Sequence, residues 1–143
     1  MGQQQLLLVI LVTIIVGIAT VVALNVFNTS ADQANRDAVR QDILTASANA
    51  QGYFKRPTML DGGGNSFEEL SIDRLGMPGV VEGDRVINEN GEYQIEGEPA
   101  EEEFTIVGEP SGDSDPITGR IHRDDDNGGW DIEWTSEESS EGE

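Results

Sequence analysis

The chain has 143 residues, no cysteine, and 28 Asp and Glu against 8 Lys and Arg, which gives a formal charge of -20 at pH 7. This acid excess excludes nucleic acid as a partner, because phosphate binding needs a basic surface, and the lack of cysteine excludes disulfides and thiol chemistry. An acidic surface with a single lysine, Lys55, is typical of a halophilic protein, since concentrated salt screens self-repulsion; an acidic surface in ordinary buffer is the alternative.

The first predicted element is an apolar run, residues 6–24, interrupted only by Thr13, Gly17 and Thr20. As a helix rising about 1.5 Å per residue, the run is close to the roughly 30 Å thickness of a bilayer core. A removed secretory signal, cleaved at residues 21–23, is the less favoured alternative, because the run is too long and no basic residue precedes it. The missing basic flank leaves the orientation in a membrane undecided.

Beyond the apolar run, a one-sided apolar stripe predicts that the same helix continues to about Gly52. No proline occurs before Pro57, so nothing interrupts a helix of about fifty residues. The stripe consists of Phe27, Ala31, Ala34 and Ala38, followed by Val39, Ile43, Ala46, Ala50 and Tyr53 or Phe54. The positions around the stripe are held by Asp32, Arg36, Asp37, Arg40 and Asp42, which are expected to face solvent.

The rest of the chain predicts a connecting loop and then an antiparallel sheet. Residues 56–80 are rich in glycine and proline, with one helical turn expected at Ser66–Leu70, where Ser66 and Glu69 fit a capping box. A period of two then predicts strands at residues 84–87, 92–95, 103–107, 117–123 and 130–135, with hairpin turns at 88–91 and 124–129. The candidate inward residues of the last pair are Ile117, Ile121, Trp130, Ile132 and Trp134.

These elements predict an α+β fold, in which a long N-terminal helix packs its second half on a small antiparallel sheet of four or five strands. The expected divisions are an apolar transmembrane helix, residues 1–24, and its amphipathic continuation, residues 25–54. They are followed by the connecting loop, residues 55–80, the sheet, residues 81–135, and a disordered acidic tail, residues 136–143.

The pattern of residues 1 to about 54 resembles the type IV pilin-like proteins, in which an uncharged apolar helix continues into an amphipathic helix that packs on an antiparallel sheet. In that family a peptidase cuts after a glycine ahead of the apolar segment, and Gly2 before Gln3 stands where such a cut could fall. The family's glutamate at the fifth mature position is missing: Gln5 stands there if Met1 is the mature start, and Leu7 if cleavage follows Gly2.

The resemblance implies a structural subunit of an extracellular helical filament of identical chains, held in the inner membrane and handled by a pilus assembly machinery before it polymerises. A secretion-system pseudopilin shares this fold and is a second implication. Gly17 is expected to be a close-packing position between helices, or a place where the helix loosens. The implied filament-core residues are Leu6, Leu7, Leu8, Ile10, Leu11, Ile14, Ile15, Gly17, Ile18, Val21, Val22 and Leu24.

Few residues could carry other chemistry. His122 is the only histidine and is expected at the surface, so no enzyme activity and no cofactor are predicted. The carboxylates in the turn at 124–131 could wrap a calcium ion, although such a turn needs no metal; the candidate ligands are Asp124, Asp126, Asn127 and Asp131. Asn28 begins an N-glycosylation pattern, Asn-Thr-Ser. A membrane-tethered module that binds a cation or a basic partner is the alternative to the filament subunit.

Overall fold

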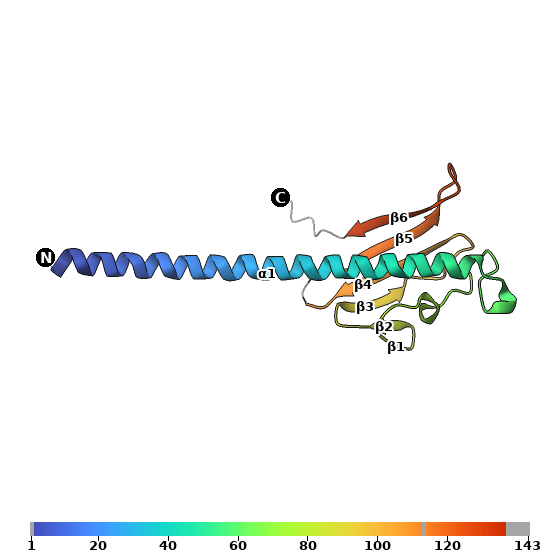
Figure 1. Cartoon of the computed structure of the whole chain (residues 1–143), viewed down its shortest axis with the longest axis horizontal. Coiled ribbons are helices and arrows are strands. Elements are labelled where there is room, and N and C mark those ends of the chain that lie inside the picture. The colour runs from blue at the N-terminus through green and yellow to red at the C-terminus, as the bar shows by residue number, and fades with distance from the viewer. Residues whose placement is uncertain (1, 113, 137–143) are drawn as a thin grey trace. The chain divides into compact units, whose positions relative to one another are not determined.

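The computed structural model describes residues 2–112 and 114–136. Helix α1 (Gly2–Lys55) is followed by two short 3-10 helices, η1 (Thr58–Leu60) and η2 (Ile72–Leu75), and by six strands (Figure 1). The chain divides into two compact units, residues 1–34 and residues 35–143, and the second unit contains the sheet. The predicted α+β class is confirmed. The strands are β1 (Val80–Glu82), β2 (Arg85–Ile87), β3 (Gly91–Ile95), β4 (Glu103–Pro110), β5 (Ile117–Arg123) and β6 (Trp130–Ser136).

The sheet is an antiparallel meander in which each strand pairs with the next along the chain. The hairpin around residues 88–91 and the hairpin around residues 124–129 are confirmed. The predicted number of four or five strands is wrong, because β1 adds a sixth strand to the sheet. Gly83 has φ +66 at the first position of the two-residue turn between β1 and β2, which is the conformation that a tight hairpin asks of glycine.

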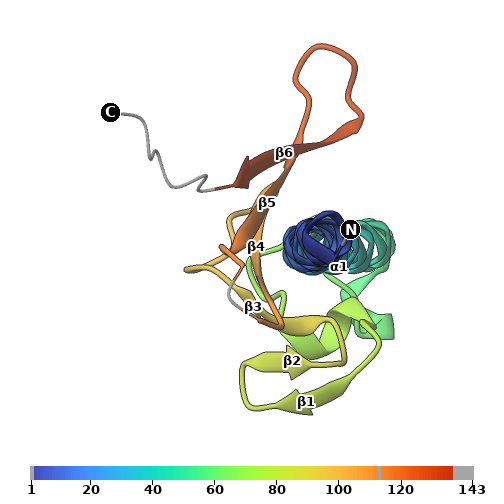
Figure 2. The same cartoon turned by 90° about the vertical axis from the view of Figure 1, so that its left-hand side faces the viewer.

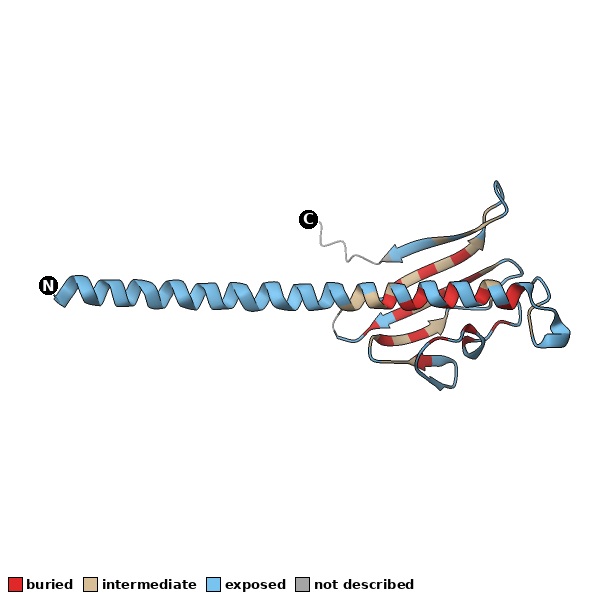
Figure 3. Ribbon diagram, viewed as in Figure 1, coloured by how far each residue is buried: buried red, intermediate tan, exposed pale blue. Residues whose placement is uncertain are grey.

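The core forms where the second part of α1 packs on one face of the sheet (Figures 1 and 2). Val39, Ile43, Ala46 and Ala50 are fully buried, as predicted, and Figure 3 shows this stripe in red along the helix. Phe27, Ala31 and Ala34 are exposed instead of buried, because the unit that supplies the sheet begins at Asn35. The sheet residues of this core include Tyr93, Phe104, Ile106, Ile117 and Ile121.

Gly108 of β4 lets the helix approach the sheet closely. A Cβ added at Gly108 would lie 2.6 Å from Val39 Cγ1 and 3.2 Å from Ile43 Cδ1, well inside van der Waals contact. Both neighbours are fully buried and cannot turn away into solvent. The absence of a side chain at Gly108 therefore sets how deeply the helical stripe can sit on the sheet.

Several local predictions need correction. Helix α1 ends at Lys55, three residues beyond the expected end at about Gly52. Residues Ser66–Leu70 form no helical turn: the Ser66 hydroxyl accepts a hydrogen bond from the Glu68 N–H, and the Leu70 N–H donates to the Phe67 carbonyl. A short helix lies further along the chain instead, at η2, whose Ile72 and Leu75 are buried in the core together with Phe67.

The outer strand β6 also differs from the prediction. Trp130 and Ile132 pack against the core, but Trp134 is 38 % exposed. Trp130 lies among aromatic rings, with centroids 4.9 Å from Phe54 and 5.1 Å from Phe67. Trp134 lies on the predicted inward face, with its ring beside Gly119, and stays partly exposed because β6 is the edge strand of the sheet. Most of the predicted acidic tail, residues 137–143, lies outside the described residues.

Replacing Gly108 by alanine should lower the stability of the sheet unit by about 1–3 kcal/mol, since the added methyl group overpacks the contact with Val39. Gly52→Ala is the matched control, because a Cβ at this exposed helical position meets nothing and should stabilise the helix by up to about 1 kcal/mol. Thermal unfolding of the full chain in detergent, followed by tryptophan fluorescence, measures both. Equal melting temperatures for the two variants would contradict this account of the contact.

Candidate functional site

The apolar segment of α1 is exposed on every side. The large apolar side chains between Leu6 and Leu24 are 48–66 % exposed, and Gly17 has open space around it. The helix is long and apolar enough to cross a membrane by length and composition. All of the predicted filament-core residues lie on this segment, and Gly2 and Gln3 lie in its first turn. Exposing an apolar surface of this size to water is unfavourable, so the segment is expected to be buried in a membrane or against other protein.

The two hydroxyl groups in this segment are satisfied within the helix. The Thr13 hydroxyl donates to the Val9 carbonyl at 2.7 Å, and the Thr20 hydroxyl donates to the Val16 carbonyl at 2.8 Å. Since an unpaired polar group is expensive in an apolar medium, these bonds suit the segment to hydrocarbon or to a dry helical core. Asn28 lies further along the same helix, exposed, so its side chain is accessible to glycosylation, which stays a prediction.

A buried carboxyl group ties α1 to the β2–β3 hairpin. Asp42, expected to face solvent, is buried instead. Three donors converge on its Oδ2 atom: the Tyr93 hydroxyl at 2.5 Å, the Asn88 side-chain amide at 3.0 Å and the Asn90 side-chain amide at 2.9 Å. Burial, and then the hydrogen bond to Asp42, raise the pKa of the Tyr93 phenol above its ordinary value, so the phenol stays protonated and donates.

The sequence contained a signal for this position. Asp42 lies three residues after Val39 and four before Ala46, so its spacing places it on the buried face of the helix with Ile43. Its charge alone predicts a position in solvent. The sequence predicts Asn88 only as part of the hairpin turn at residues 88–91. Its side-chain oxygen does serve that turn, because it accepts hydrogen bonds from the N–H groups of Asn90 and Gly91. Its amide nitrogen, however, reaches the helix, which turn chemistry alone does not predict.

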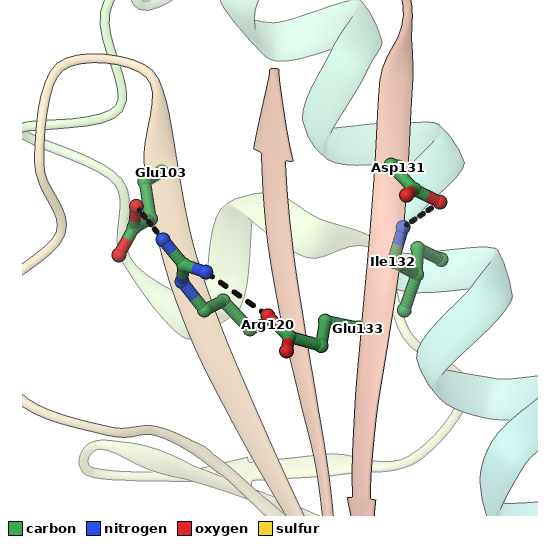
Figure 4. Close-up of polar contacts among 5 residues, drawn as sticks. All are labelled: Glu103, Arg120, Asp131, Ile132 and Glu133. Carbon is green, nitrogen blue, oxygen red and sulfur yellow. Dashed lines mark hydrogen bonds and ion pairs between the residues drawn. The ribbon is translucent and has the colours of Figure 1, made fainter. Parts of the chain in front are cut away.

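The outer face of the sheet carries a row of charged side chains across β4, β5 and β6 (Figure 4). Arg120 donates to Glu103 at 2.6 Å and to Glu133 at 3.0 Å. The hydrogen bond from Arg120 lowers the pKa of Glu103, and both carboxylates raise the pKa of Arg120. All three side chains are well exposed, so solvent screens these ion pairs and they add little to stability.

The candidate metal ligands lie in the β5–β6 turn and on β6, where three of the four side chains accept a backbone hydrogen bond. Asp124 accepts from the Asp126 N–H, Asn127 from the Gly129 N–H, and Asp131 from the Ile132 N–H, the last shown in Figure 4. Within residues 2–112 and 114–136, no three His, Cys, Asp or Glu side chains are grouped so that they could hold a metal ion. The structure therefore does not bring these ligands together, and calcium binding stays a prediction.

His122 lies on β5, directly opposite Glu103 on β4 and Asp131 on β6. The side chain is half-buried, and its Nδ1 atom has no hydrogen-bond partner in the described part of the chain. A general base needs a nucleophile within hydrogen-bond reach, and His122 donates or accepts no side-chain hydrogen bond there. That the chain is not an enzyme stays a prediction.

Removing the partners of the buried carboxyl group should destabilise the sheet unit. Tyr93→Phe deletes one donor and should cost about 1–3 kcal/mol. Asp42→Ala should cost more, because it leaves the buried Tyr93 hydroxyl unpaired and also removes the acceptor of the half-buried Asn88 and Asn90 amides. Asp37→Asn is the control: this exposed position on the same helix should change stability by no more than about 0.5 kcal/mol. Urea unfolding of the full chain in detergent measures the differences. An Asp42→Ala variant as stable as Asp37→Asn would contradict the proposed role of this contact.

Two features of the described residues are thus suited to a function: a fully exposed apolar helical segment, and a sheet unit with an acidic, ion-paired outer face. The first requires a hydrophobic environment, and the second suits contact with water and salt. A scan of family models, a search of curated proteins and a search of solved structures each found no match to the chain.

Proposed function

We propose that the chain is a structural subunit of an extracellular filament of the type IV pilus kind, which polymerises through its apolar segment and carries the acidic sheet unit on the outside. The observation that carries the proposal is that α1 continues from an apolar segment exposed on every side into a stripe that is buried against the sheet. A fold that needed only a membrane anchor would not require the helix of the anchor to be the central helix of the sheet unit.

In this proposal the apolar segment is buried in two environments in turn, first the membrane and then the core of the filament. Before assembly a bilayer covers it, and the chain is a single-pass membrane protein. During assembly lipid contacts are exchanged for helix-to-helix packing in a dry core, which favours small residues such as Gly17 at the closest approaches. A head-to-tail contact that does not close on itself then extends into a helical polymer. Cleavage after Gly2, leaving Gln3 as the first residue, is part of the same proposal.

A membrane-tethered binding module is the second candidate, since the apolar segment is able to cross a membrane on its own. It accounts for the exposed segment without any second copy of the chain. The two candidates differ in where the mature protein is found: in a fibre shed from the cell surface, or in the membrane fraction alone.

Ile14→Asp should abolish filaments, because an unpaired carboxylate costs about 2.5–3.5 kcal/mol at the centre of an apolar helix in a membrane and has no partner in a dry core. Gly17→Leu separates packing from insertion: it keeps the segment apolar and should leave insertion intact while reducing the yield of filaments.

Gln33→Asp is the control for charge, because it adds the same group to an exposed position of α1 beyond the apolar segment. Electron microscopy of sheared fibres, with the chain quantified in the membrane fraction, reads out all three variants. Normal filaments from Ile14→Asp would rule out a core built from this segment.

A further inference from the structure

The loop after α1 is folded back onto the end of the helix. The N–H groups of Gly63, Gly64 and Asn65 donate to the carbonyls of Tyr53, Arg56 and Phe54 at 2.8, 2.9 and 2.7 Å. These carbonyls belong to the last turn of the helix or directly follow it, where partners within the helix are missing. Asp61, further along the loop, forms an ion pair with Arg74 of η2. The loop is therefore held in one conformation by its own backbone.

This well-fastened loop presents apolar side chains to water. Met59 is 94 % exposed and Leu60 is 68 % exposed, and both lie in η1. The neighbouring Lys55 and Arg56 are exposed too, and in the part of the chain that the structure describes neither has a carboxylate within ion-pair distance. We call these four residues, Lys55, Arg56, Met59 and Leu60, the tip. Apolar side chains displayed on a fixed loop and flanked by unpaired cations are typical of a contact surface.

The charge of the chain indicates what the tip contacts. Lys55 and Arg56 give the tip two basic side chains, whereas residues 57–136 carry 21 Asp and Glu against four Arg. Arginines on the sheet, such as Arg120, are already paired with carboxylates, so most of the acids there have no basic partner to share. The surface that best complements the basic tip is therefore the acidic sheet unit of another copy of the same chain.

We propose that the tip of one chain docks on the acidic sheet unit of a second copy. This contact rests on the proposed filament, in which many copies lie side by side. It joins two different surfaces, the tip of one chain and the sheet unit of the next, so it extends from copy to copy and does not close into a pair. The tip thus adds a contact between sheet units to the one between apolar segments.

The single lysine allows a direct test of this contact. A zero-length carbodiimide couples an amine to a carboxylate that touches it, and Lys55 has the only side-chain amine of the chain. Filaments grown from mixed light and 15N-labelled chains should give a product that joins Lys55 of one copy to a carboxylate at residues 57–136 of another. Mixed-isotope peptide pairs in the mass spectrum identify it as intermolecular. Lys55→Arg keeps the charge and should remove the product without loss of filaments.

Two further variants test the apolar and the charged parts of the tip. Met59→Ser with Leu60→Ser should lower the yield of the Lys55 product, and so should Arg56→Glu, by about tenfold where like charge replaces opposite charge. Both changes fall on exposed side chains, so the fold is expected to persist. Leu44→Ser, an exposed apolar position on α1 outside both the tip and residues 57–136, is the matched control and should leave the yield unchanged.

The outcomes separate this contact from the filament itself. Filaments that form normally but give no intermolecular Lys55 product would overturn the tip contact and leave the filament standing. A product whose yield is unaffected by both tip variants would overturn it as well. A Lys55 adduct with phosphatidylserine from the membrane, in place of the protein product, would assign the tip to anionic lipid. Chains that never assemble would overturn the filament and the contact together.

Discussion

Burial of one face of α1 against the sheet is the interaction on which the rest of the structure depends. The sheet has one apolar face, and the helical stripe at Val39, Ile43 and Ala46 covers it. Gly108 brings the two surfaces into close contact, and the hydrogen bonds to Asp42 fix the β2–β3 hairpin to the same helix. The acidic outer face can then remain in water, because the opposite face supplies the hydrophobic stabilisation.

Periodicity predicted this architecture because both of its periods are strong in the sequence. The helical stripe from Val39 and the alternating strands follow directly from hydrophobic spacing. Each miss has its own physical cause. Asp42 can be buried because side chains 46 to 51 residues away donate hydrogen bonds to its carboxylate. The local pattern of polar and apolar residues does not predict partners so distant in the sequence. Trp134 is partly exposed because β6 is the edge strand, with no further strand beside it among the described residues. The rigid tip at Met59 depends on backbone hydrogen bonds, which leave no pattern of polarity in the sequence.

The two parts of α1 have opposite requirements, and this contrast is the basis of the proposed function. Beyond Asn35, the apolar stripe of the helix is buried within its own unit. The large apolar side chains from Leu6 to Leu24 are exposed and pack against nothing in the described part of the chain. A filament core satisfies the second requirement with other copies of the same segment, and a bilayer satisfies it with lipid. Adaptation to salt stays a prediction; if it holds, screening would let surfaces whose carboxylates outnumber their arginines lie close together.

The most direct test of the central claim is negative-stain electron microscopy of material sheared from the cells that make this chain, with mass spectrometry of its N-terminus. The filament account predicts thin fibres that contain the chain, beginning at Gln3 or at a modified Met1. An intact chain found only in the membrane fraction, with no fibres, would contradict it and favour a tethered module.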